Sequence, residues 1–121
     1  MIVDSAVYID GKRMAQTPPI ADVYEVCQDL GGIAWIGLYK PTEAEFKLIA
    51  DEFDLHELAI EDAVQAHQRP KLERYGNTLF VVLSAARYDD KSETVEFAEL
   101  HVFVGPDFVI TIRPGDGSEL S

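Results

Sequence analysis

Residues 71–113 read KLERYGNTLFVVLSAARYDDKSETVEFAELHVFVGPDFVITIR, and they indicate the fold class most directly. This stretch holds four segments that are rich in the β-branched and aromatic residues favoured in strands. The segments span residues 71–75, 78–88, 94–104 and 107–113. The junctions between them favour tight turns, and they are Gly76-Asn77, Asp89-Asp90-Lys91 and Gly105-Pro106. The pattern therefore predicts four consecutive antiparallel strands joined by hairpin loops.

Upstream of these strands, a short apolar run at residues 33–39, IAWIGLY, is typical of a buried strand. A helix is predicted before it, within TPPIADVYEVCQDLGG. Thr17 is expected to cap this helix, Pro18 to occupy its first turn and Gly31 to end it.

Two further helices are predicted between this run and the four strands. The first begins at Thr42, which forms a predicted capping box with Glu45 because each side chain can satisfy the other's free N–H. Its expected buried face consists of Phe46, Ile49, Ala50 and Phe53. The second helix spans about residues 57–66, where Asp54 and Glu57 repeat the capping spacing.

The order of these elements predicts one α/β domain with a mixed sheet. Residues 3–9 alternate as a strand does, and Asp10-Gly11 predicts a tight turn into a short second strand. A chain of 121 residues fits one domain with a single hydrophobic core. We expect the domain to span residues 1–114, with residues 115–121 as a linker or a truncation point.

The charge balance is strongly acidic, since 22 Asp and Glu against 10 Lys and Arg give a formal net charge of −12. Such a surface repels nucleic-acid phosphates and anionic lipids, so nucleic-acid binding is disfavoured. The single cysteine, Cys27, is expected to be a small buried thiol in a reducing cytosolic setting. No apolar run approaches the ~20 residues of a membrane helix, and the chain as given is expected to be soluble.

The helix at residues 57–66 concentrates the candidate metal ligands. Its apolar residues share one arc, and they are Ala59, Ile60, Ala63, Val64 and Ala66. Glu61 and Asp62 project from the polar side about 100° apart, so each can offer one oxygen ligand to an approaching ion. Residues 43–62 hold eight carboxylates opposed only by Lys47, and a divalent cation relieves such repulsion. Oxygen ligands favour magnesium or calcium over zinc, although a merely solvated acidic face explains the same pattern.

Motifs for catalysis or for a transition metal are absent from the sequence. His56, His67 and His101 lack the spacing of a zinc site, so structural or surface roles are expected for them. No GxSxG, P-loop or GxGxxG pattern is present, and no pocket is marked for a carboxylate-pair hydrolase, so we expect no enzyme. Arg69 and Lys71 follow the acidic helix, where local salt bridges are the simpler expectation and an anion site is the alternative.

Several of these segments form a familiar combination. In chain order they are Trp35 in its apolar run, Pro41 before the helix that carries Glu45, LHELAIEDA at residues 55–63, QRPK at residues 68–71 and TLFVVL at residues 78–83. Together they resemble the N-terminal cytoplasmic domain of the CorA family of magnesium and cobalt transporters, over about residues 33–113. The combination of EDA with QRPK at this spacing is a fairly specific feature of the family.

The resemblance implies an αβα layered domain with a mixed, largely antiparallel sheet. It implies a homopentamer at the cytoplasmic face of the cell membrane, whose subunits add a long stalk helix and two C-terminal membrane helices. In that assembly Asp62 would share a divalent ion with an acidic residue of the neighbouring subunit's stalk, and Glu61 would belong to a second nearby ion site. Weakly bound regulatory Mg2+, or Co2+, would then favour the closed channel.

Parts of the family pattern are not in this sequence. It holds no stalk, no membrane helix and no Gly-Met-Asn motif. We therefore expect either a sensor domain truncated before those parts or a stand-alone acidic interaction module of the same fold without a transport role. Glu57 stands where the family often has proline, which adds a carboxylate to the acidic helix. A zinc-transporting branch shares the architecture, so zinc is an alternative ion.

Overall fold

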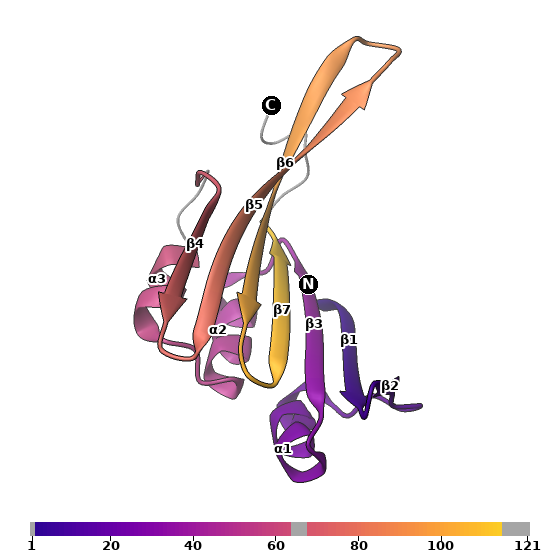
Figure 1. The fold of residues 1–121 in the computed structure, drawn as a ribbon, viewed down its shortest axis with the longest axis vertical. Helices are drawn as coiled ribbons and strands as arrows, with labels where there is room; N and C mark the ends of the chain where they lie inside the picture. The colour runs from indigo at the N-terminus through magenta and orange to yellow at the C-terminus, as the bar shows by residue number, and fades with distance from the viewer. Residues whose placement is uncertain (1, 64–67, 115–121) are drawn as a thin grey trace.

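The computed structural model describes residues 2–63 and 68–114, which form one seven-stranded sheet and three helices (Figure 1). In chain order the elements are β1 (Ile2–Ile9), β2 (Lys12–Arg13), α1 (Ile20–Leu30), β3 (Ile33–Tyr39), α2 (Glu43–Glu52), α3 (Glu57–Ala63), β4 (Lys71–Tyr75), β5 (Thr78–Asp89), β6 (Thr94–Val104) and β7 (Phe108–Arg113). The predictions of a strand at residues 33–39 and of four strands after residue 70 are confirmed.

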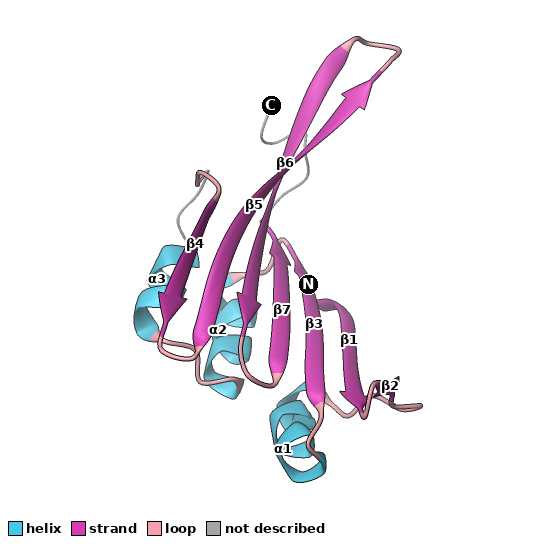
Figure 2. Ribbon diagram, in the orientation of Figure 1, coloured by secondary structure: helices cyan, strands magenta, loops and turns pink. Residues whose placement is uncertain are grey.

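The sheet is mixed, with the strand order β2-β1-β3-β7-β6-β5-β4 (Figure 2). Neighbouring strands run antiparallel except for β3 and β7, which pair in parallel with Ile36 opposite Ile110. This parallel pair joins the N-terminal hairpin to the C-terminal meander of strands. The predicted mixed, largely antiparallel sheet is therefore confirmed.

All three helices contribute to one apolar core on one face of the sheet (Figure 1). The fully buried members of this core are Val7, Val23, Ala34, Ile36, Ile49, Ala59, Phe80, Phe103 and Ile110. The predicted inner face of α2 is buried as expected. Cys27 of α1 lies in the same core, where burial and then the nearby Asp107 carboxylate raise the pKa of its thiol. The predictions of an α/β fold and of a buried thiol are confirmed.

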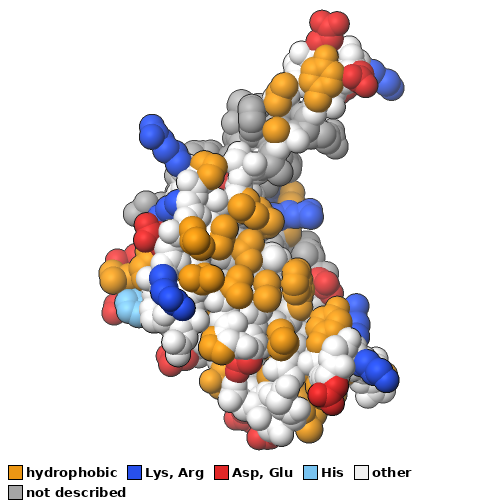
Figure 3. Space-filling model, viewed as in Figure 1, with side chains coloured by type: hydrophobic (Ala, Val, Ile, Leu, Met, Phe, Trp, Pro, Cys, Tyr) orange, Lys and Arg blue, Asp and Glu red, His pale blue; other side chains and the backbone are white. Residues whose placement is uncertain are grey.

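The opposite face of the sheet carries large apolar side chains that no described helix covers. Figure 3 shows these hydrophobic side chains gathered over the strands. Leu72 of β4 is 65% exposed, and Trp35 of β3 is 42% exposed. On β3, Trp35 alternates with the buried Ala34 and Ile36, because successive side chains of a strand point to opposite faces. The described residues thus supply one helical layer and the sheet of the expected αβα arrangement.

The hairpin of β5 and β6 extends well beyond the rest of the sheet (Figure 1). β4 pairs with β5 only over residues 78–82, and β7 pairs with β6 only over residues 101–104. The outer parts of the two strands therefore pair only with each other, from Leu83 opposite Leu100 to Asp89 opposite Thr94.

Local sequence signals account for two of the turns. Asp10 and Gly11 have φ angles of 52° and 78°, as the hairpin turn between β1 and β2 requires. Gly31 ends α1 in the left-handed conformation, with φ 66° and ψ 35°. Both predictions are confirmed.

The predicted start of α1 is wrong. The helix begins at Ile20, Pro19 occupies the capping position, and no side chain caps the helix. Instead, the Thr17 hydroxyl donates a hydrogen bond to the carbonyl oxygen of Ser5 at 3.2 Å. A residue that precedes proline is biased away from the helical region, so Pro19 prevents a helical turn at Pro18.

The predicted capping box of α2 is confirmed. The Glu45 N–H donates to the Thr42 hydroxyl oxygen at 3.1 Å, and the Thr42 N–H donates to Glu45 Oε1 at 2.9 Å. The bond from the Thr42 N–H lowers the pKa of the Glu45 carboxyl below its ordinary value of 4.5, because it favours the ionised form.

We predict a pH-dependent contribution of Glu45 to stability. A carboxyl whose pKa is lowered by folding stabilises the fold above its unfolded pKa, and this stabilisation is lost as pH falls through the lowered value. Glu45→Gln should therefore be less stable than the parent protein at neutral pH, and the difference should shrink as pH falls below 4.5. Urea denaturation of both proteins over a series of pH values measures this, and a difference independent of pH would contradict it.

Candidate functional site

The predicted metal ligands both belong to α3, which lies against the core. Ala59 is fully buried, whereas Ile60 and Ala63 pack partly against the core. This confirms the described part of the predicted apolar arc, while Val64 and Ala66 lie outside the described residues. Glu61 is exposed, as its place on the polar side predicts. The backbone of Asp62 is part of α3, but its side chain lies outside what the structure describes.

His56, the residue before α3, caps the start of the helix, a role that the sequence did not indicate. Its Nδ1 accepts a hydrogen bond from the Leu58 N–H at 3.1 Å, and its carbonyl oxygen accepts one from the Ile60 N–H at 3.1 Å. The predicted capping pair of Asp54 and Glu57 is wrong, since Asp54 has a φ of 50° and lies three positions before Glu57, the first residue of the helix. The turn at residues 53–54 places the imidazole, rather than a carboxylate, beside the first free N–H groups.

The imidazole of His56 also contacts the edge strand β4. Its ring centroid lies 5.7 Å from that of Tyr75, with 33° between the two planes. The start of α3 is thus held against the end of β4, so one side chain both caps the helix and fixes it to the sheet.

The segment that follows α3 is anchored by a buried carboxylate of β6. Glu99 is 6% exposed, and its Oε1 accepts a hydrogen bond from the Gln68 N–H at 2.7 Å. His101, which is 2% exposed, places its Nε2 at 3.2 Å from the same oxygen. The pair lies within ion-pair distance, and among the described residues His101 Nε2 has no hydrogen-bond partner. Of the structural and surface roles expected for His101, its burial favours the structural one.

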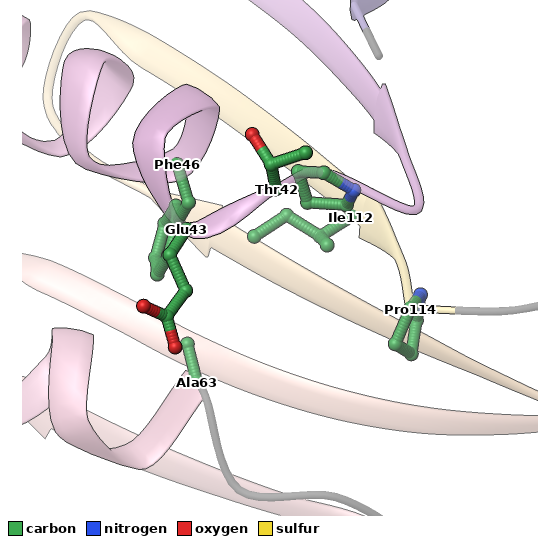
Figure 4. Close-up of a pocket in the computed structure, with 7 residues that line it drawn as sticks. Thr42, Glu43, Phe46, Ala63, Ile112 and Pro114 are labelled. Carbon is green, nitrogen blue, oxygen red and sulfur yellow. The ribbon is translucent and has the colours of Figure 1, made fainter.

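Near the end of α3 lies a crevice of about 210 Å³ between α2, α3 and β7 (Figure 4). Its lining consists of Pro41, Thr42, Glu43, Phe46, Ala63, Ile112 and Pro114. The Glu43 side chain extends from the first turn of α2 towards Ala63, the neighbour of Asp62 in the chain (Figure 4). Glu43 therefore brings a further carboxylate towards the acidic end of α3, although its place in the sequence assigned it no role.

The carboxylates of this region do not converge into a complete cation site. Among the residues that the structure describes, no group of three or more His, Cys, Asp and Glu side chains is placed to hold a metal ion. Single oxygen ligands on an exposed helix suit a largely hydrated ion such as magnesium, which commonly takes only one or two carboxylates from a protein. Glu61 and Asp62 therefore stay predicted metal ligands.

Comparisons with known proteins agree on the family. The family described as CorA-like Mg2+ transporter protein matches residues 31–120. YfjQ of Bacillus subtilis (strain 168) is 42% identical over 79 residues, which is 65% of this chain and 24% of that protein. The cobalt/magnesium transport protein CorA of Thermotoga maritima is 31% identical over 65 residues, which is 54% of this chain and 18% of that protein.

The fold agrees with a solved structure as well. The soluble domain of CorA from Methanocaldococcus jannaschii superimposes with a TM-score of 0.61 at 13% identity, covering 99% of this chain and 44% of that one. At this identity the likeness concerns the fold alone. Within residues 2–63 and 68–114, no helix has the length and apolar character needed to cross a membrane.

The chain spans about a quarter or less of the length of these two curated relatives. Since the family match covers residues 31–120, this chain belongs to the family of CorA-like Mg2+ transporter proteins.

Proposed function

We propose that this chain is the cytoplasmic, divalent-cation-sensing regulatory domain of a CorA-like magnesium and cobalt transporter. The observation that carries the proposal is the arrangement of α3. Its apolar side is buried against the core, and Glu61 is exposed on the other side. Glu61 and the adjacent Asp62 then act as partial sites that a neighbouring subunit completes in a homopentamer.

Linkage supplies the mechanism. A cation that binds only where two subunits abut stabilises the assembled state by its difference in affinity between the two states. Sites repeated around a ring add their contributions, so weak binding at each interface still shifts the equilibrium towards the closed channel. Weak affinity suits an abundant cytosolic ion such as Mg2+, with Co2+ as a second ion of the same site.

The electrostatics of the chain support a cation as the ligand. Its formal net charge is −12, and α2 and α3 carry most of the acidic side chains between residues 43 and 62. Glu45 Oε1 is engaged by the Thr42 N–H in the capping box, whereas Glu61 and Glu43 are both exposed. Contact with the membrane would be made only through C-terminal helices of the full-length protein.

The first test is an NMR titration of this chain with millimolar magnesium. We expect saturable shifts in the amide resonances of α3, and Asp62→Ala should abolish them because it removes one of the two proposed ligands. Asp29→Ala is the matched control, since it deletes an exposed carboxylate of the same kind from α1. Its titration should resemble that of the parent protein.

One result of this titration would contradict the proposal. Small shifts spread over the whole acidic surface, and equal in both variants, would indicate charge screening without a site. Unchanged spectra throughout would mean that the isolated domain binds no cation. The next test is then Asp62→Ala in the full-length protein. Sensing by α3 is rejected if magnesium still inhibits transport by that variant.

A further inference from the structure

The structure describes seven residues of α3, Glu57–Ala63, and the first turn of the helix is held by contacts outside it. At its start the Leu58 N–H, one of the donors that the helix itself cannot satisfy, is bonded to His56 Nδ1 at 3.1 Å. This bond and the contact of the same ring with Tyr75 fix the first turn relative to β4.

The hydrogen bond specifies the chemical state of the imidazole. Nδ1 can accept a hydrogen bond only while it carries a lone pair, so this bond requires a neutral ring with its single proton on Nε2. A proton added to Nδ1 turns this acceptor into a donor that faces the Leu58 N–H, and the cap is lost. The resulting positive charge is also unfavourable beside the N-terminus of a helix.

The charged residues nearest to His56 in its own segment are Asp54 and Glu57. From β4, the Tyr75 ring lies against the imidazole. The positive end of the α3 dipole favours the neutral ring.

We propose that His56 is a pH-sensitive positioning residue of the cation-binding helix. Its neutral imidazole holds the first turn of α3 in place and so presents Glu61 and Asp62, whereas a proton on the ring releases that turn and weakens divalent-cation binding. His56 does not contact the ion. The proposal rests on the proposed function of α3, and it adds a coupling between protons and cations at that site.

The experiment uses the whole chain and two variants. In His56→Asn, a short amide oxygen replaces the imidazole as the cap but does not titrate, whereas His56→Ala removes the cap at every pH. Nitrogen NMR of the His56 ring identifies the tautomer, and the Leu58 amide resonance reports the cap. Magnesium titrations at about pH 8 and about pH 6, a range in which histidine changes charge, report the coupling.

For the parent protein we expect the Nε2–H tautomer at the higher pH and loss of the Leu58 hydrogen bond at the lower pH. Magnesium affinity at α3 should be about two- to fivefold weaker at the lower pH, the effect of losing one cap. His56→Asn should restore most of that affinity at the lower pH. His56→Ala should bind weakly at both.

Two outcomes would overturn the proposed role of His56 and leave the proposed function of α3 intact. One is an Nδ1–H tautomer at the higher pH, which cannot accept the Leu58 N–H. The other is an equal pH dependence of magnesium binding in the parent protein and His56→Asn, which would assign the dependence to carboxylates. If neither the parent protein nor either variant binds magnesium, the isolated chain holds no cation site and the coupling fails, while the ring and Leu58 signals still decide whether His56 caps α3.

Discussion

Phe103→Ala is expected to lower the free energy of unfolding by about 3–5 kcal/mol, the usual cost of emptying a large buried site. Phe103 lies on β6 and is fully buried. Its ring centroid is 4.8 Å from that of Phe80 on β5 and 6.1 Å from that of Phe46 on α2. The substitution therefore leaves a cavity at the centre of the contact between the sheet and the helical layer.

Urea denaturation measures this loss, and Tyr88→Ala is the matched control. Tyr88 is an aromatic residue of the same hairpin, but it is 59% exposed and lies beyond the main sheet. Its removal should cost less than about 1 kcal/mol. Equal losses in the two variants would contradict the described core. If Phe103→Ala does not fold, Phe103→Leu fills more of the site and should retain the fold with a smaller loss.

The strands were predictable because their signals are local. β3 spans the predicted residues 33–39, since a short run of apolar residues is bounded by Gly32 before it and Pro41 after it. The start of α2 was predictable for the same reason, as its two capping residues are three positions apart. The start of α1 was not, because two consecutive prolines displace the helix from the threonine that precedes them.

The candidate site was predictable only in part. The exposure of Glu61 follows from helical periodicity, but the contacts that fix α3 depend on tertiary structure. Histidine is not a typical capping residue, and the ring contact with β4 cannot be derived from spacing. Glu99 binds a residue 31 positions away in the sequence. One signal was available in the sequence. Glu99 and His101 lie four and two positions before the buried Phe103, so they face the same side of the strand, where apolar residues are expected.

Glu99→Ala is expected to lower the free energy of unfolding by about 2–4 kcal/mol, and to disturb α3 more than its distance in sequence suggests. The substitution leaves the Gln68 N–H without its acceptor and a cavity beside His101. Because Gln68 follows α3 closely in the chain, loss of this anchor should also change the amide resonances of the helix.

Glu99→Gln keeps a hydrogen-bond acceptor at residue 99 but removes the charge of the side chain. Its amide oxygen can still accept the Gln68 N–H, so the Gln68 amide should stay protected from hydrogen exchange, whereas in Glu99→Ala it should exchange faster. The stability that Glu99→Gln loses measures what the charge of residue 99 contributes at 3.2 Å from His101 Nε2. If both variants lost equal stability and both kept the α3 resonances unchanged, Glu99 and His101 would stabilise the sheet without positioning α3. The position of the acidic helix would then depend on His56 and the apolar core alone.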